Sequence, residues 1–89
     1  MRVRPEAELD LEVAAGWYEA RRRGFGAEFY DELSQRLDSL ADSALLYEER
    51  FSGVRRLFSR RFPYAIYYRI LDDEVVVIAI LHMRRRSPP

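Results

Sequence analysis

Residues 64–83 read YAIYYRILDDEVVVIAILHM, and this stretch decides the fold. Two runs rich in β-branched and aromatic residues, 64–71 and 74–83, stand on either side of the pair Asp72-Asp73. Such runs around two short polar residues are typical of antiparallel strands joined by a tight turn. If the two aspartates form the turn, Leu71 pairs with Glu74, and every later pair in the hairpin follows from that one.

This register predicts two different faces for the hairpin. The first face, expected to lie under the helices, has Tyr64, Ile66, Tyr68 and Ile70 beside Leu81, Ala79, Val77 and Val75. The second has Ala65, Tyr67 and Arg69 beside Ile80, Ile78 and Val76, with His82 at its end. Because the second face is too apolar for an open solvated surface, we expect a partner to bind there. Alternatively, residues 45–53 or the C-terminal tail of the same chain cover this second face.

The chain around the hairpin adds further strands. Residues 54–60 show the same period of two and are separated from the hairpin by Phe62-Pro63, a pair that interrupts a strand. Residues 1–4 are predicted to add an edge strand, and residues 45–53 to be irregular.

Residues 5–22 have the pattern of an amphipathic helix. A proline and several acids open the segment, and two glycines follow its arginine-rich end, which are start and stop signals. The pattern predicts one broad apolar stripe with Trp17 in the core. The stripe consists of Leu9, Val13 and Trp17, flanked by Leu11, Ala14 and Tyr18.

A second helix is predicted from Ala27 to Ala44. Its apolar face carries Phe29, Leu33, Leu37, Leu40, Ala41 and Ala44. Because the connection between the two helices is short, they must lie antiparallel. The expected fold is α+β, an N-terminal helical hairpin packed on one face of a small curved antiparallel β-sheet, in one domain over residues 1–89.

Composition narrows the function classes. The chain has no cysteine and a single histidine, so we expect no metal site and no cofactor. It has no apolar run long enough for a membrane span and no secretory leader, so we expect a cytoplasmic protein without a membrane partner.

The formal net charge of zero hides an asymmetry along the chain. Residues 1–49 hold six arginines and twelve acids, a net charge of −6, whereas residues 50–89 hold nine arginines and three acids, a net charge of +6. The second half is therefore the candidate for binding an anionic partner. All fifteen basic residues are arginine, which suits bidentate binding of carboxylate or phosphate, although GC-rich codon usage explains the same bias.

Several segments, in this order along residues 3–86, resemble the RelE/ParE toxins of bacterial type II toxin–antitoxin systems. They are WYE at 17–19, GFG at 24–26 with Phe29, VRR at 54–56, FPYAIYYRI at 62–70 and VIAILHMRR at 77–85. The resemblance implies a helical hairpin on a curved antiparallel sheet, which agrees with the fold predicted above. It also implies a cognate antitoxin whose C-terminal segment wraps the toxin, and this matches the apolar second face. A homodimer and a toxin–antitoxin hetero-oligomer both stay open.

The superfamily contains two activities. RelE-like members cleave messenger RNA on the ribosome, and ParE-like members bind and inhibit DNA gyrase. A nuclease needs proton-transfer groups as well as cations. RelE-like enzymes place lysines on the sheet and a tyrosine near the C-terminus, whereas this chain has no lysine and ends in Pro89.

These differences, and the zero net charge, favour the ParE-like activity over the ribosome-dependent endoribonuclease. A folded module that has lost its toxicity is a third alternative. The expected contacts for target or antitoxin are Arg55, Arg56, Tyr67, Arg69, His82, Arg84, Arg85 and Arg86. For the nuclease alternative, the catalytic candidates are His82, Arg56 and Arg61, with Tyr67, Glu48 and Glu49 as further proton-transfer groups.

Overall fold

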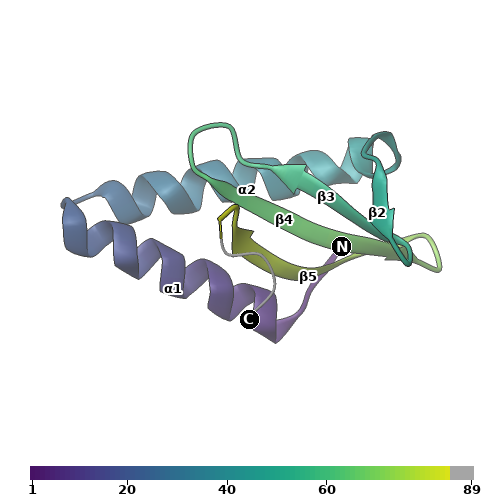
Figure 1. The fold of residues 1–89 in the computed structure, drawn as a ribbon, viewed down its shortest axis with the longest axis horizontal. Coiled ribbons are helices and arrows are strands. Elements are labelled where there is room, and N and C mark those ends of the chain that lie inside the picture. The colour runs from purple at the N-terminus through teal and green to yellow at the C-terminus, as the bar shows by residue number, and fades with distance from the viewer. Residues whose placement is uncertain (85–89) are drawn as a thin grey trace.

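The structure, a computed structural model that describes residues 1–84, is a helical hairpin on a five-stranded sheet (Figure 1). The helices are α1 (Pro5–Arg21) and α2 (Phe25–Ser43), followed by the 3₁₀ turn η1 (Ala44–Leu46). The strands are β1 (Arg2–Val3), β2 (Glu49–Phe51), β3 (Val54–Phe58), β4 (Tyr64–Leu71) and β5 (Glu74–His82). The α+β class and the helical hairpin on one face of the sheet are confirmed.

The sheet has the order β1-β5-β4-β3-β2. Its pairs are antiparallel except for β1, which runs parallel to β5. Residues 49–51 were predicted to be irregular and instead form β2. This strand extends the sheet at its edge next to β3, so it does not cover the apolar face.

The tight turn of the β4–β5 hairpin is confirmed. Asp72 and Asp73 have φ angles of 50° and 63°, as a two-residue turn of type I′ requires, and Leu71 pairs with Glu74. The predicted register then holds as far as the pair Tyr68 and Val77. Ile66 and Tyr68 are buried on the helix side, as predicted.

The predicted register is wrong beyond Val77. A β-bulge in β5 inserts one residue, so Tyr67 pairs with Ala79 instead of Ile78, and Ile66 pairs with Ile80. The bulge sends Ile80 to the helix side, where it joins the core, and His82 lies on that side against Tyr64. Both residues were predicted on the opposite face.

The core lies between the helical hairpin and the sheet. In α2 the predicted face is confirmed for Phe29, Leu33, Leu37 and Leu40, all of which are buried, while Ala41 is exposed. Gly26 lets the two helices approach closely, because a Cβ there would lie 2.6 Å from the Ala15 carbonyl oxygen.

For α1 the prediction was right that Leu11, Ala14 and Tyr18 are buried and wrong that the core also includes Leu9, Val13 and Trp17. The core residues of α1 are Ala7, Leu11, Ala14 and Tyr18. Leu9, Val13 and Trp17 are 59%, 64% and 50% exposed. Small residues in the buried stripe let α1 pack close to β5, and this closeness also brings Asp10 within hydrogen-bond reach of the bulge. The Asp10 carboxylate accepts the Ile80 backbone N–H at 2.9 Å.

Two other carboxylates fix loops to the helices. Glu19 accepts the backbone N–H of Gly24 and of Gly26 at 3.1 Å and 3.0 Å, which satisfies free donors at the start of α2. Glu32 accepts the hydroxyl of Ser59 at 2.9 Å and the backbone N–H of Arg60 at 2.6 Å, and so holds the β3–β4 loop.

Candidate binding face of the sheet

The sheet has a second face, turned away from the helices, which we call the outer face. Strand alternation and the bulge determine which side chains lie on it. From β3 these are Val54, Arg56 and Phe58; from β4, Ala65, Tyr67, Arg69 and Leu71; from β5, Val76, Ile78, Ala79 and Leu81; and beside β5, Arg2 and Arg4. Apolar side chains and arginines are therefore mixed on one surface.

The floor of the outer face is apolar and closely covered. Val54, Ala65 and Val76 are 2%, 0% and 1% exposed, although none of them belongs to the core cluster under the helices. We infer that longer neighbours on the same face cover them, because arginine and tyrosine side chains lay apolar stems over small residues. The polar ends of these side chains remain at the surface, available to a partner.

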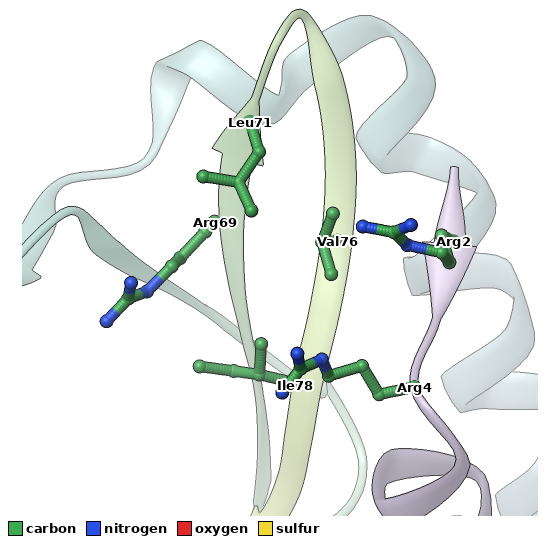
Figure 2. Close-up of a pocket in the computed structure, with 6 residues that line it drawn as sticks. All are labelled: Arg2, Arg4, Arg69, Leu71, Val76 and Ile78. Carbon is green, nitrogen blue, oxygen red and sulfur yellow. The ribbon is translucent and has the colours of Figure 1, made fainter.

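An open pocket of about 280 Å³ lies at the β1 side of this face (Figure 2). Its floor is Val76 and Ile78, and Leu71 closes one end. Figure 2 shows Arg2 and Arg4 on one side of β5 and Arg69, from β4, on the other. Arg2 and Arg4 extend toward the apolar floor, whereas the Arg69 side chain extends from β4 away from β5. Cationic and apolar groups thus lie together, which suits a segment that carries both a carboxylate and an apolar side chain.

The charges of this pocket are weakly compensated. Arg2 lies 4.0 Å from Glu74, and both side chains are largely exposed, so this contact contributes little. Arg4 and Arg69 make no ion pair or side-chain hydrogen bond within residues 1–84. Their positive charge is thus available to an incoming anion.

The β3 side of the outer face is aromatic and cationic. The Arg56 guanidinium lies 4.6 Å from the centre of the Phe58 ring, a cation–π contact. Arg56 is paired across the strands with Tyr67, so both side chains extend from the same face. Arg56, Tyr67 and Arg69, three of the residues predicted from the sequence, are therefore brought together here.

Other predicted site residues lie elsewhere. Arg55 pairs with Tyr68 on the helix side and donates from Nη1 to the Tyr47 carbonyl oxygen at 2.6 Å. Arg61 donates to the Glu28 carboxylate at 2.9 Å, and this hydrogen bond is the main reason why the pKa of Glu28 is lowered.

The predicted residues at the end of β5 are separated from the outer face too. The half-buried His82 ring stacks edge-on against Tyr64, and its Nδ1 accepts the Arg84 backbone N–H at 3.0 Å. Arg84 is exposed, while Arg85 and Arg86 lie outside the described residues.

Comparison with protein families gives one match over nearly the whole chain. Residues 1–87 match the family described as ParE toxin of type II toxin-antitoxin system, parDE. The chain belongs to this ParE toxin family. The resemblance to RelE/ParE toxins, and the choice of the ParE-like branch, are thereby confirmed.

A solved structure has the same ParE fold. It is described as the chromosomal ParDE TA system from P. aeruginosa, with a TM-score of 0.80, 19% identity and 91% coverage of both chains. At this identity the match is evidence for the fold alone. A comparison with curated protein sequences finds no match.

In the described part of this ParE chain, no helix has the length and apolar character needed to cross a bilayer. Residues 1–84 also contain no group of three or more histidine, aspartate or glutamate side chains placed to hold a metal ion together.

Sequence reasoning missed three residues of the ParE outer face. Arg2 and Arg4 were counted with the acidic half of the chain, but β1 pairs with β5 and carries them to the basic face. The predicted edge strand at residues 1–4 was the signal that would have placed them there. Leu71 was read only as the residue before the turn, although it closes one end of the pocket.

Proposed function

We propose that this chain is a ParE toxin that inhibits DNA gyrase by binding in the bacterial cytoplasm, and that a cognate antitoxin neutralises it by covering the outer face. The observation that carries the proposal is the outer face itself. Its arginines line an open pocket together with the partly exposed Ile78 and Leu71, while the smaller apolar residues beneath them are covered. Membership of a family of type II toxins supports the same conclusion.

The chemistry of the outer face favours an antitoxin segment that is both acidic and apolar. Apolar side chains of the segment would cover Ile78 and Leu71, and its carboxylates would pair with Arg4 and Arg69. A disordered tail that folds on binding fits such an extended surface. The solved relative is described as a ParDE system, which supports a toxin that is paired with an antitoxin.

Of the nuclease candidates, Tyr67 lies beside Arg56, but His82, Arg61 and Glu49 lie apart from them, and this arrangement favours binding over RNA cleavage. Arg56 extends from the outer face, whereas His82 lies on the helix side and Arg61 is engaged by Glu28 on α2. Acid–base catalysis requires proton donor, base and cation within hydrogen-bond reach of one substrate. Glu49, on β2, pairs with Arg55 on the helix side, away from Arg56. We therefore assign Arg56, Tyr67 and Arg69, with Arg2, Arg4 and Arg84, to contacts with target or antitoxin.

The test of the target is a paired assay on the purified chain. Gyrase supercoiling and cleavage of a messenger positioned on ribosomes are each measured with and without the protein. We expect loss of supercoiling and an intact messenger. Cuts at defined codons with normal supercoiling would instead assign the chain to the RelE-like nucleases. If expression without antitoxin leaves bacterial growth unchanged, the chain is a folded module without toxicity.

The test of the antitoxin face uses a charge reversal and a matched control. Arg69→Glu places an acid beside the pocket, while Arg23→Glu makes the same change at the exposed turn of the helical hairpin. Antitoxin co-expression should rescue growth of cells that produce the Arg23→Glu protein. Rescue should fail, or need at least about tenfold more antitoxin, for Arg69→Glu, because one lost charged contact is worth about 1.4 kcal/mol or more. Equal rescue of both variants would place the antitoxin elsewhere.

A further inference from the structure

A second apolar stripe runs along the solvent side of α1. Leu9, Val13 and Trp17 are 59%, 64% and 50% exposed, and they follow one another at intervals of four residues. Gly16 and Ala20 lie on the same side and are exposed as well. A Cβ on Gly16 would meet nothing within 4 Å, so the surface at that point is open.

Leu9 and Val13 lie outside the core of the monomer, and the Trp17 ring touches that core through an edge-on contact with Tyr18. The core side of α1 is formed by other residues, Ala7, Leu11, Ala14 and Tyr18. Nothing in the described chain packs over Val13, which is the most exposed of the three. Aligned large apolar side chains at the surface are characteristic of protein interfaces. The Arg21 guanidinium lies 3.5 Å from the Trp17 ring centre and partly shields it, while Leu9 and Val13 stay open.

The stripe is complementary to itself. Leu9 and Trp17 stand at equal distances, four residues, on either side of Val13. If two α1 helices cross antiparallel at Val13, Leu9 of each packs against Trp17 of the other, in the space left by Gly16. The same symmetry places Glu6, which is exposed in the first turn, beside Ala20 and Arg21 of the second copy. Acids at one end of the helix thus meet arginines at the other, and the helix dipoles oppose each other favourably.

We propose that two copies of this chain associate through α1, antiparallel and with Val13 at the two-fold axis. The outer face of the sheet is on the opposite side of the molecule from the helices and stays open in such a dimer. The proposal is therefore independent of the proposed function, since a dimer through α1 is compatible with any target. A single helix pair gives an interface at the small end of the known range, so we expect a dissociation constant on the order of 1–100 µM.

The experiment is sedimentation equilibrium on the full chain across that range of concentration, with Val13→Glu and Leu46→Glu as a matched pair. Both changes put a glutamate at a highly exposed apolar position, Leu46 being 82% exposed in η1. The wild type and Leu46→Glu should pass from monomer to dimer as concentration rises. Val13→Glu places two carboxylates together at the axis and should weaken the dimer at least about tenfold. A wild type that stays monomeric throughout, or equal behaviour of the two variants, overturns the proposal.

A charge exchange tests the antiparallel arrangement. Glu6→Arg and Arg21→Glu should each weaken the dimer, and the two changes together should recover part of the lost affinity. Losses that simply add would overturn the antiparallel crossing.

Other occupants of the stripe give different results. If deleting residues 85–89 turns a monomeric chain into a dimer sensitive to Val13→Glu, that segment covers the stripe in the native chain and the proposal is wrong. If the chain is monomeric and Val13→Glu weakens only the capture of antitoxin, the stripe belongs to the antitoxin and the proposal is again wrong.

Discussion

At the scale of single residues, Asp10 is a side chain whose role the sequence did not reveal. Its position among the acids at the start of a helix suggested a favourable interaction with the helix dipole. In the folded chain its carboxylate reaches the backbone N–H of Ile80, just beyond the β5 bulge. A backbone N–H at a strand edge costs free energy when it has no acceptor. Because β1 is too short to reach Ile80, the Asp10 carboxylate takes the place of the acceptor that a longer neighbouring strand would provide.

Removing this acceptor should destabilise the fold. We expect Asp10→Ala to lower the free energy of unfolding by about 1–3 kcal/mol, because the part-buried Ile80 N–H loses its partner. Asp10→Asn keeps an oxygen acceptor and should lose less than half as much. Urea denaturation followed by circular dichroism measures both, with Glu8→Ala, exposed in the same turn, as control. If Asp10→Ala unfolds like the control, the contact does not stabilise the bulge.

Tyr68 should make the stability of the chain sensitive to high pH. Its side chain is fully buried, and its hydroxyl donates to the Ala44 carbonyl oxygen at 2.5 Å. Burial raises the pKa of Tyr68 to about 12, because its effect outweighs that of the nearby Arg55 charge, which lowers the pKa. The unfolded chain releases this proton near pH 10, so the folded form loses its advantage as the pH rises from about 10 to about 12.

The variant Tyr68→Phe should separate the two contributions. It lacks the hydroxyl, so at neutral pH it should be less stable by about 1 kcal/mol. Its stability should fall less steeply between about pH 10 and pH 12, although Tyr18, whose pKa burial also raises, leaves some slope. Urea midpoints at pH 8 and at pH 11 measure this, with the exposed Tyr30→Phe as control. Parallel losses in Tyr68→Phe and wild type would exclude Tyr68 as the source.

At the scale of elements, patterns that depend on neighbouring residues were predictable from the sequence. The predicted bounds of α1 agree with the structure to within one residue. Four of the residues predicted for the buried face of α2, one phenylalanine and three leucines, are buried. The Asp72-Asp73 turn correctly fixed the first pair of the hairpin. The bulge was not predictable, because the run around Ile78 consists of similar apolar residues and shows no break. Which α1 residues are buried depends on how closely the helix approaches β5, and the small Ala7 and Ala14 permit a close approach on the side that also carries Leu11 and Tyr18.

The exposure of Trp17 leads to a test of α1 packing. At protein concentrations low enough to exclude association, Trp17→Ala should lower the free energy of unfolding by about 1–2 kcal/mol, because the half-exposed ring loses only its contacts with Tyr18 and Arg21. Phe29→Ala, at a fully buried aromatic residue of α2, should cost about 3–5 kcal/mol. Guanidinium denaturation of the two variants gives both values. A loss for Trp17→Ala as large as that for Phe29→Ala would mean that the tryptophan lies in the core.

At the scale of the whole molecule, the chain has a well-packed helix side and an open outer face. The sequence predicted that the second sheet face would be apolar and would carry Tyr67 and Arg69, and the structure places them there beside Arg56. The contribution of β1 could not be predicted from the charge of each half of the sequence. Arg2 and Arg4 belong to the acidic first half, but β1 pairs with β5 and therefore lies beside the basic second half. Arg55 and Arg61, chosen from the same basic half, face carbonyl and carboxylate partners of the helix side instead.

Such a one-sided molecule should be stabilised strongly by whatever covers its outer face. On the proposed function, a peptide from the acidic, apolar tail of the cognate antitoxin binds the folded chain alone, so at a hundred times its dissociation constant it adds about 2.7 kcal/mol. For a domain of this size, that corresponds to a rise in Tm of roughly 10–20 °C.

The arginines of the pocket determine how that rise should vary. Because Arg2, Arg4 and Arg69 supply its charge, the rise measured at fixed peptide concentration should shrink as salt increases. It should largely disappear in a variant with all three arginines changed to glutamine, whereas the single change Arg23→Gln should preserve it. Differential scanning calorimetry measures each case. A rise that is independent of salt and equal in the triple variant would mean that the antitoxin binds through another surface, with the exposed stripe of α1 as the next one to test.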